Sequence, residues 1–427
     1  IPKMLTRILV ALLTVIPLTL TAAKRYLGGD ISLLPEIEHP GAKYLTHDGK
    51  PIADLLPWLH EQGMTAMRVR LFVNPDEYKK LHPENATGDL HYDPNACQSF
   101  EYIRPLCRKI VDNGMDLMLD FHYSDTWADP TAQWTPVDWE GFDDDQLCQK
   151  IYDYTRETLL ELRADGVVPA FIQPGNEISF GMLWGPAGTS DPLKTLYGSD
   201  ANWDRLGRLL TNAIRACREV CPEAKIVIHT ERIAQPDVAR NFYEQMKRMN
   251  IDYDIIGLSY YPYFHGGLDK LTESLDMLGA NFADKDIMIV ETGYSYKWAV
   301  PGSNFDHTAV WPYSDAGQDL FARQLVETLE RYDYVNGLFW WWMEYNAYGT
   351  DLTGWYNAPL FDSTTGRACQ ALTTICSYAR GGDALTPVLT DNRSNNAWFD
   401  LGGRPMTDRP EKPGVYLRGD GTKVIVR

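Results

Sequence analysis

The sequence contains little histidine and cysteine, and neither residue type is clustered. Nine histidines and seven cysteines occur among 427 residues, with no CxxC motif and no spacing typical of a zinc site. We therefore expect no zinc-binding domain. The cysteines are interpreted as buried thiols, with a disulfide left open, and their odd number leaves at least one without an intrachain partner. They are Cys97, Cys107, Cys148, Cys217, Cys221, Cys369 and Cys376.

Positive charge is also scarce. The chain has 40 Lys and Arg residues against 58 Asp and Glu residues, a formal net charge of −18, and no basic stripe suited to a phosphate backbone. Nucleic acid is therefore a poor candidate partner, and a neutral substrate is favoured. The one long apolar run, residues 8–20, is interrupted by Pro17 and is shorter than the about 20 residues that span a membrane.

Residues 4–23 have the pattern of a secretory signal peptide. Arg7 precedes the apolar run, and the small residues Thr21, Ala22 and Ala23 follow it. We therefore expect a secreted, periplasmic or cell-surface protein with no membrane span after removal of this segment, and a monomer. Residues 1–3 are interpreted as an upstream remnant.

The rest of the chain has the composition of a globular protein, with 44% apolar and 23% charged residues. Short β-prone segments alternate with longer amphipathic segments about eight times. This alternation predicts an α/β fold, a (β/α)8 TIM barrel over residues 24–380. The expected strands are 26–29, 66–71, 116–122, 171–176, 226–229, 255–260, 287–291 and 337–341.

The predicted barrel is longer than the about 250 residues of a plain one. The additional residues lie in long βα loops, at 73–100, 123–145, 178–203 and 292–318, which belong to the face where barrel enzymes hold their sites. Residues 381–427 form a Gly/Pro/Asn-rich tail with short expected strands. Its GVY and KVIVR segments resemble C-terminal tails of exported Bacteroidetes proteins, and both a sorting appendage and a disordered tail remain open.

Two glutamates each close an apolar strand. Glu177 follows the fourth expected strand and Glu291 ends the seventh, and a carboxylate at a strand's C-terminal end projects into the barrel mouth. Glycoside hydrolysis uses such a pair, one carboxyl protonated and the other ionised. An isolated glutamate at a strand end is more often structural, so the inference depends on the pair.

Six segments around these sites resemble glycoside hydrolase family 53, the arabinogalactan endo-β-1,4-galactanases. They are GGDISLLPEIE (28–38), RVRLFVNP (68–75), LDFHYSDTWADP (119–130), GNEISFGMLW (175–184), GLSYYPYFHGGL (257–268) and VETGYSY (290–296). The resemblance implies a retaining enzyme with Glu177 as acid/base and Glu291 as nucleophile. It places Asn176 on the sugar 2-hydroxyl and Arg70 beside Glu291.

We also expect sugar contacts from several neighbouring side chains. Tryptophans can stack on the apolar faces of sugars, and Trp127, Trp184, Trp341 and Trp355 are the candidate platforms. A buried ion pair for Arg70, a core role for His122 and a turn cap for Asp125 remain alternatives. The expected substrate contacts are Arg70, His122, Asp125, Trp127, Asn176, Trp184, His229, Tyr260, Tyr261 and Trp341.

The family resemblance leaves some points open. No cofactor is required, and calcium, which some bacterial members hold after the seventh strand, is left open in a loop with Asn304, Asp306, His307 and Asp315. Trp342, Met343 and the pair Thr230-Glu231 depart from the family pattern, which leaves the outer subsites and strict endo cleavage undecided. An endo-mannanase, an endoglucanase and a non-catalytic sugar-binding barrel are the alternatives to a galactanase acting on a polysaccharide.

Overall fold

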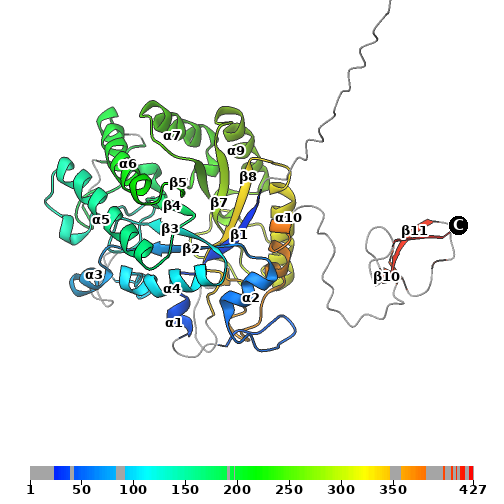
Figure 1. The fold of residues 1–427 in the computed structure, drawn as a ribbon. Coiled ribbons are helices and arrows are strands. Elements are labelled where there is room, and N and C mark those ends of the chain that lie inside the picture. The colour runs from blue at the N-terminus through cyan, green and yellow to red at the C-terminus, as the bar shows by residue number, and fades with distance from the viewer. Residues whose placement is uncertain are drawn as a thin grey trace, which may run out of the picture.

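The computed structural model describes residues 24–38, 43–82, 92–189, 193–196, 198–346 and 357–380, together with short segments at 398–399, 405–406, 410, 414–418 and 423–426. Eight parallel strands close into a barrel in sequence order (Figure 1). They are β1 (Tyr26–Asp30), β2 (Ala66–Leu71), β3 (Asp116–Phe121), β4 (Phe171–Pro174), β5 (Lys225–Thr230), β6 (Ile255–Tyr260), β7 (Asp286–Thr292) and β8 (Val335–Trp340). The predicted (β/α)8 fold and its eight strands are confirmed.

Helices surround the barrel and cover the outer faces of its strands (Figure 1). They are α1 (Leu34–Glu38), α2 (Leu55–Gln62), α3 (Pro75–Leu81), α4 (Phe100–Asp112), α5 (Asp144–Ala164), α6 (Asp200–Val220), α7 (Pro236–Arg248), α8 (Pro262–His265), α9 (Leu268–Asn281), α10 (Asp315–Leu329) and α11 (Gln370–Ile375). Short 3-10 helices are η1 (Val137–Trp139), η2 (Ile178–Phe180), η3 (Arg232–Ala234) and η5 (Tyr378–Arg380).

Local sequence signals set where these helices begin and end. The Asp143 side chain accepts a hydrogen bond from the backbone N–H of Gln146, whose side chain bonds back to Asp143, so α5 begins with a capping box. The helix is followed by Gly166 at φ 77°, a left-handed conformation that glycine adopts without steric cost. The ends of this helix were therefore readable from the sequence.

The interior of the barrel has an apolar layer and, above it, a polar layer. The apolar layer contains Ala66, Met118, Phe171, Val227, Met288, Val290 and Phe339. At the next inward position along β1 to β6, on the same side because side chains alternate, the interior becomes polar. Asp30, Arg68, Asp120, Gln173, His229 and Ser259 are all buried there.

Strand β7 contains an irregularity that determines which way Glu291 points. Ile289 pairs with Leu258 of β6, but Glu291 pairs with Ser259, so Val290 is an extra residue on β7. Val290 belongs to the apolar interior layer, and Glu291 lines the barrel mouth. A bulge of this kind places two consecutive side chains on one face, and without it the alternation would direct Glu291 outward.

All seven cysteines lie in the described part of the chain, and none forms a disulfide there. Burial raises the pKa of the Cys107 thiol to about 12, so this thiol stays protonated and unreactive. Six of the cysteines are buried and Cys97 is partly buried, which agrees with their interpretation as buried thiols.

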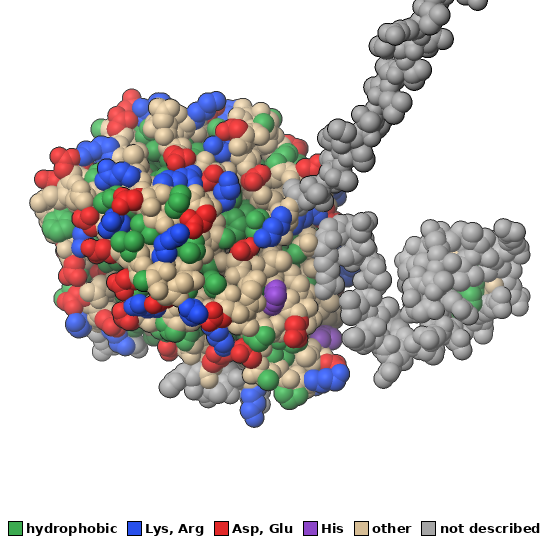
Figure 2. Space-filling model, in the orientation of Figure 1, with side chains coloured by type: hydrophobic (Ala, Val, Ile, Leu, Met, Phe, Trp, Pro, Cys, Tyr) green, Lys and Arg blue, Asp and Glu red, His purple; other side chains and the backbone are tan. Residues whose placement is uncertain are grey.

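Outside the barrel, the described tail segments form a four-stranded sheet in the order β10-β9-β11-β12. The strands are β9 (Trp398–Phe399), β10 (Pro405–Met406), β11 (Gly414–Arg418) and β12 (Lys423–Val426), and all neighbours are antiparallel. The barrel face in Figure 2 carries acidic and basic side chains interspersed. No helix within the described residues is long and apolar enough to cross a membrane, and the expected signal peptide lies outside those residues.

Candidate active site

A pocket of about 810 Å³ opens at the C-terminal ends of the barrel strands. Loops after β2 to β8 contribute to it, which agrees with the placement of sites in barrel enzymes. Its lining residues include Asp93, His122, Trp127, Asp129, Asn176, Glu177, Glu231, Arg232, Gln235, Tyr261, His265, Glu291, Asn304, Trp341 and Trp342. The two glutamates singled out in the sequence therefore meet in one cavity.

Glu177 is held in an uncommon backbone conformation where β4 gives way to η2. Its φ of 47° and ψ of 53° are left-handed, and Gly175 before it has φ 101°. A Cβ at Gly175 would lie 2.6 Å from Ile178 Cγ2, so only glycine fits this turn. Strained residues of this kind are concentrated at functional sites. Here the turn directs the Glu177 carboxyl into the pocket.

Ser259 on β6 lies between the two glutamates. Its hydroxyl donates to Glu177 Oε1 at 2.6 Å and lies 3.5 Å from Glu291 Oε2. His229 Nδ1 accepts from the Glu177 backbone N–H at 3.3 Å and lies 3.0 Å from both the Gln173 amide nitrogen and Asn176 Oδ1. On the other side of the ring, Nε2 lies 2.8 Å from Ser259 Oγ.

His229 is fully buried beneath the pocket. Burial and the nearby Arg68 charge lower the pKa of His229 well below its usual range, so the ring is neutral. The expectation that His229 contacts sugar is wrong: it orients Ser259 and the Glu177 backbone instead. Its strand position could not reveal this, because Glu177 covers it only after β4 and β5 pair.

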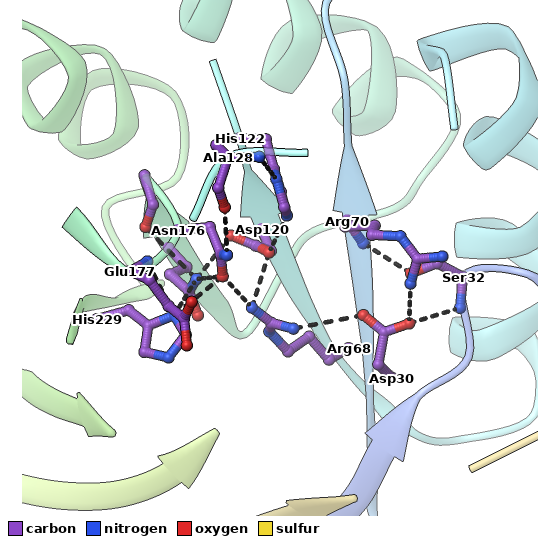
Figure 3. A network of polar contacts seen from close by, with 12 residues as sticks. Asp30, Ser32, Arg68, Arg70, Asp120, His122, Ala128, Asn176, Glu177 and His229 are labelled. Carbon is purple, nitrogen blue, oxygen red and sulfur yellow. Dashed lines mark hydrogen bonds and ion pairs between the residues drawn. The ribbon is translucent and has the colours of Figure 1, made fainter. Parts of the chain in front are cut away.

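Arg68, and not Arg70, is the cation beside Glu291. Arg68 Nη1 lies 2.9 Å from Glu291 Oε1, and its Nη2 lies 2.7 Å from Asp120 Oδ2. Arg70 Nη1 instead pairs with Asp30 at 2.7 Å (Figure 3). Both arginines point inward because they are two residues apart on β2. Arg70 is turned toward β1, so its predicted place beside Glu291 is corrected.

Asn176 joins the polar interior layer to the pocket. Its Oδ1 accepts from Arg68 Nη2 at 2.8 Å, and its Nδ2 donates to the Ala128 carbonyl at 2.7 Å (Figure 3). His122 also lines the pocket, with Nε2 3.1 Å from Asp120 Oδ2 and Nδ1 accepting from the Ala128 N–H. Both side chains are thus fixed in orientation before any substrate binds.

The adjacent tyrosines after β6 point to opposite sides. The Tyr261 hydroxyl donates to Glu291 Oε2 at 2.9 Å, so this tyrosine orients the carboxylate. The Tyr260 hydroxyl donates to the Gly266 carbonyl and lies outside the pocket lining. Neighbouring residues of a strand face opposite sides, so Tyr260 belongs to the core, contrary to expectation.

Aromatic rings form one wall of the pocket. Trp341 and Trp342 stack with ring centroids 4.4 Å apart, and Trp127 lies edge-on to both while its Nε1 donates to Asp93 at 2.8 Å. Arg70 lies behind this wall, its guanidinium 4.7 Å from the Trp127 ring. Trp127 and Trp341 therefore lie where a sugar can stack, and Trp342 joins them. Trp355 lies outside the described residues.

Two other expected contacts are structural. Asp125 is buried and accepts backbone N–H bonds from Asn74 and Val137, both at 2.8 Å, which ties the loops after β2 and β3 together. Trp184 is buried, donates to the Phe180 carbonyl and packs on Trp134. Neither lines the pocket. Burial by long loops is a tertiary feature, so the sequence could not distinguish these residues from pocket residues.

The loop considered for calcium does not bring its oxygen ligands together. Asp306 accepts hydrogen bonds from Thr308 within its own turn, His307 bonds to the Pro262 carbonyl and Asp315 bonds to Gln370. Throughout the described chain, no group of three or more His, Cys, Asp or Glu side chains is placed to hold a metal ion.

The two pocket glutamates lie in different electrostatic surroundings. Burial raises the pKa of Glu177 well above its usual range, and the charges of Glu291 and Glu231 add to this effect. Burial also raises the pKa of Glu291, but Arg68 and the Tyr261 hydroxyl oppose it. The proton of the pair therefore resides on Glu177, because a nearby cation favours the ionised form only at Glu291.

Several charged residues at the site were not predicted, among them Arg68 and Asp120 beneath the glutamates and Asp93, Asp129 and Arg232 in the pocket lining. Arg68 could have been found from its even spacing with Arg70, and Asp120 from its even spacing with His122. Glu344 was not predicted either, because no sequence pattern distinguishes it. It follows β8, is fully buried and does not line the pocket. Burial next to Asp30 raises the pKa of Glu344 to about 8, so it is protonated at neutral pH.

A closed (β/α)8 barrel with two carboxyls of unequal proton affinity in its mouth defines a barrel glycoside hydrolase. The chain belongs to glycosyl hydrolase family 53, whose family profile matches residues 26–375. It is 30% identical to arabinogalactan endo-beta-1,4-galactanase A of Aspergillus niger over 352 residues, 79% of this chain and 91% of that one.

Solved structures agree with this membership. A family 53 catalytic domain from Ignisphaera aggregans superposes with a TM-score of 0.70 at 29% identity, covering 83% of this chain and 96% of that one. A structure of fungal beta-1,4-galactanases superposes with a TM-score of 0.67 at 26% identity, covering 83% and 100%. The likeness therefore extends over the whole catalytic barrel of these relatives.

Proposed function

We propose that this chain is a retaining endo-β-1,4-galactanase that cleaves internal bonds of the (arabino)galactan side chains of pectin, with Glu291 as nucleophile and Glu177 as general acid/base. One observation carries the proposal. The two carboxyls share Ser259 Oγ, at 2.6 Å and 3.5 Å, while only Glu291 also pairs with an arginine.

This shared hydroxyl limits the distance between the carboxyls. Glu177 Oε1 and Glu291 Oε2 can be at most 2.6 plus 3.5 Å apart, about 6 Å. Retaining glycosidases hold their carboxyls about 5 to 5.5 Å apart, whereas inverting enzymes need about 6.5 to 9.5 Å to fit a water molecule between them. The spacing supports attack by a carboxylate and not by water in the first step.

In the first step, ionised Glu291 attacks the anomeric carbon and forms a covalent glycosyl ester. The glycosidic C–O bond breaks, and protonated Glu177 gives its proton to the leaving oxygen. Arg68 and Tyr261 hold the Glu291 oxygens in place, which keeps the nucleophile oriented for this attack.

In the second step, Glu177 is ionised and acts as a base. It takes a proton from water while the water oxygen attacks the anomeric carbon, and the ester bond to Glu291 breaks. Two displacements at one carbon return the β configuration. This chemistry uses two carboxyls and water, so we propose that no cofactor takes part in it.

The choice of galactan rests on the family and its relatives. The matching Aspergillus niger protein is named for cleavage of arabinogalactan, and the pocket offers stacked tryptophans for the apolar faces of a neutral sugar chain. Pocket residues lie on both sides of the two glutamates, from β3 and β8 on one side and β5 and β6 on the other. Sugars can therefore bind on both sides of the cleaved bond, as endo cleavage requires.

The proposal is tested by release of reducing ends from β-1,4-galactan, mannan and cellulose. We expect rapid release from galactan, with short oligosaccharides as early products, and little from the other two polymers. Activity on mannan or cellulose alone would refute the substrate assignment, and oligosaccharide binding without any cleavage would refute the enzymatic one.

We further propose that the chain is exported and acts as a monomer. A polysaccharide does not cross membranes, so its hydrolase must meet it outside the cell, and residues 4–23 have the composition of a signal peptide.

The pH dependence of the enzyme should reflect the two carboxyls. kcat/KM should be bell-shaped, with an acidic limb set by ionisation of Glu291 and a basic limb set by loss of the Glu177 proton. Arg68 favours ionised Glu291, so Arg68→Met should raise the pKa of this carboxyl. We expect the acidic limb to move to higher pH by about one unit or more, measured as kcat/KM from pH 3 to 9.

Arg70→Met is the matched control, because Arg70 is equally buried on the same strand but pairs with Asp30. Its acidic limb should move less than that of Arg68→Met, and circular dichroism would verify that both variants are folded. An equal shift in the two variants would contradict the assignment of Arg68 to Glu291.

A further inference from the structure

The line from β4 to β7 divides the barrel mouth into two unequal halves. Glu177 follows β4 and Glu291 lies on β7, and the strands between them in one direction are β5 and β6. The other half contains β8, β1, β2 and β3, and it includes the wall formed by Trp127, Trp341 and Trp342. Asn176 faces this half, because its amide donates to the Ala128 carbonyl in the loop after β3. A sugar chain must cross this line, so the β5 and β6 half receives the sugars on one side of the cleaved bond.

The three tryptophans of the pocket lie in the opposite half, whereas the β5 and β6 half is lined by Gln235, Phe264, His265 and a pair of charged residues. Its charged members are Glu231 and Arg232, which follow β5 directly. Arg232 Nε donates to Glu231 Oε1 at 2.6 Å, and its Nη1 donates to Gln235 at 3.1 Å. The guanidinium also lies 4.7 Å from the Phe180 ring. Arg232 is thus fixed from three sides.

Glu231 is the anchor of this arrangement. It is 7% exposed, and its Oε1 accepts a second hydrogen bond, from Ser179 Oγ of η2 at 2.5 Å. Its Oε2 has no hydrogen-bond partner among the described residues. Burying a carboxylate with an unmade bond is costly, and in a pocket such a cost is consistent with a binding role.

We propose that Arg232 binds a hydroxyl of the leaving sugar, on the β5 and β6 side of the cleaved bond, and that Glu231 is the residue that positions its guanidinium. Nη2 of Arg232 makes no hydrogen bond to a described residue and is the donor available for this contact. The assignment of the leaving side rests on the proposed function, which makes Glu177 the proton donor to that sugar and Asn176 a contact of the other one.

The proposal also explains why a charged pair stands so close to the acid. The Glu231 charge helps to raise the pKa of Glu177 after the larger effect of burial. Burial raises the pKa of Glu231, and the Arg232 charge opposes this effect. Burial and the Arg232 charge both lower the pKa of His265, to about 4, so this histidine is a neutral member of the same half. Glu231 thus has hydrogen bonds to Arg232 and Ser179 and a charge interaction with Glu177.

The test compares two substrates with wild-type enzyme and the variants Arg232→Met and Glu231→Gln. β-1,4-Galactotetraose leaves a sugar on the Glu177 side, whereas 4-nitrophenyl β-1,4-galactobioside leaves a phenol without sugar hydroxyls. The quantity compared is kcat/KM on the tetraose divided by kcat/KM on the aryl bioside. Loss of one charged hydrogen bond should lower this ratio by roughly 10- to 100-fold in Arg232→Met. Glu231→Gln should lower it by a smaller factor.

Arg240→Met is the matched control, since Arg240 is a half-exposed arginine on α7, outside the pocket lining, whose partners are Asp237 and Glu244. Its ratio should equal that of the wild type. Equal losses on both substrates, or none, would overturn the proposal. If Glu231→Gln only moves the basic limb of the pH profile and regains the wild-type ratio at its own optimum, the positioning role is overturned.

The galactanase proposal and this inference fail in different ways. A wild-type enzyme that cleaves neither substrate contradicts the galactanase proposal. In that case the enzyme is given the tetraose and the aryl bioside of whichever β-1,4-linked sugar it does cleave, and the ratio of the two kcat/KM values is measured again. If Arg232→Met leaves this ratio unchanged, the proposed contact with the leaving sugar is overturned.

Discussion

Glu291→Gln is expected to lower kcat/KM on β-1,4-galactan by more than about 10⁴-fold, because the amide cannot form the glycosyl ester. The amide keeps the size of the carboxylate and can still bond to Tyr261. It loses the charge that pairs with Arg68 at 2.9 Å. The measurement is initial-rate release of reducing ends, with thermal unfolding to show that the barrel remains folded.

Glu344→Gln is the control for this substitution. Glu344 is a second buried glutamate, at the end of β8 and outside the pocket lining. Its pKa of about 8 means that it is protonated at neutral pH, so an amide is a close substitute. We expect activity within a few-fold of wild type. Comparable losses at Glu291 and Glu344 would show that any buried glutamate matters, and the nucleophile assignment would fail.

Glu177→Ala should show the loss typical of a general acid, between about 10²- and 10⁴-fold on galactan. The loss should be much smaller in the first step with 4-nitrophenyl β-1,4-galactobioside, because 4-nitrophenolate leaves without a proton. The space left by the side chain lies beside Ser259, whose hydroxyl bonds to Glu177 Oε1 at 2.6 Å. An anion can therefore enter where the carboxylate was.

Added azide provides the decisive measurement for this variant. Azide should attack the glycosyl ester in place of water, break its bond to Glu291 and restore turnover of the aryl substrate. The product should be a β-glycosyl azide, identified by NMR. An α-glycosyl azide would instead assign Glu177 as the nucleophile, and absence of rescue together with a full loss on the aryl substrate would contradict its role as acid/base.

The retaining assignment depends on both results. If Glu291 is the nucleophile and Glu177 the acid/base, wild-type enzyme gives products of β configuration, and the variants fail at different steps. The structural reason is the unequal surroundings of the pair: Arg68 and Tyr261 contact Glu291, whereas Glu177 has other carboxylates as its nearest charges. Without this difference in surroundings, neither glutamate would be favoured as the ionised nucleophile or as the protonated acid.

The sequence by itself determined the fold and the two glutamates. Eight apolar segments that alternate with amphipathic ones indicate parallel strands with helical crossovers, and a carboxylate at the C-terminal end of such a strand lies toward the face where barrel enzymes hold their sites. The alternation of side chains along a strand also separates Tyr261 from Tyr260 once the strand limits are known.

Only the tertiary structure decided which neighbours serve the glutamates. Arg68 and Arg70 share one face of β2, and the choice between them depends on where β1 and β7 lie across the barrel. The bulge at Val290 turns Glu291 inward against the period of its strand. Asp125 and Trp184 are removed from the pocket by the packing of loops distant in sequence. Local periodicity contains none of this, because these positions are fixed by contacts between strands and loops that the closed barrel brings together.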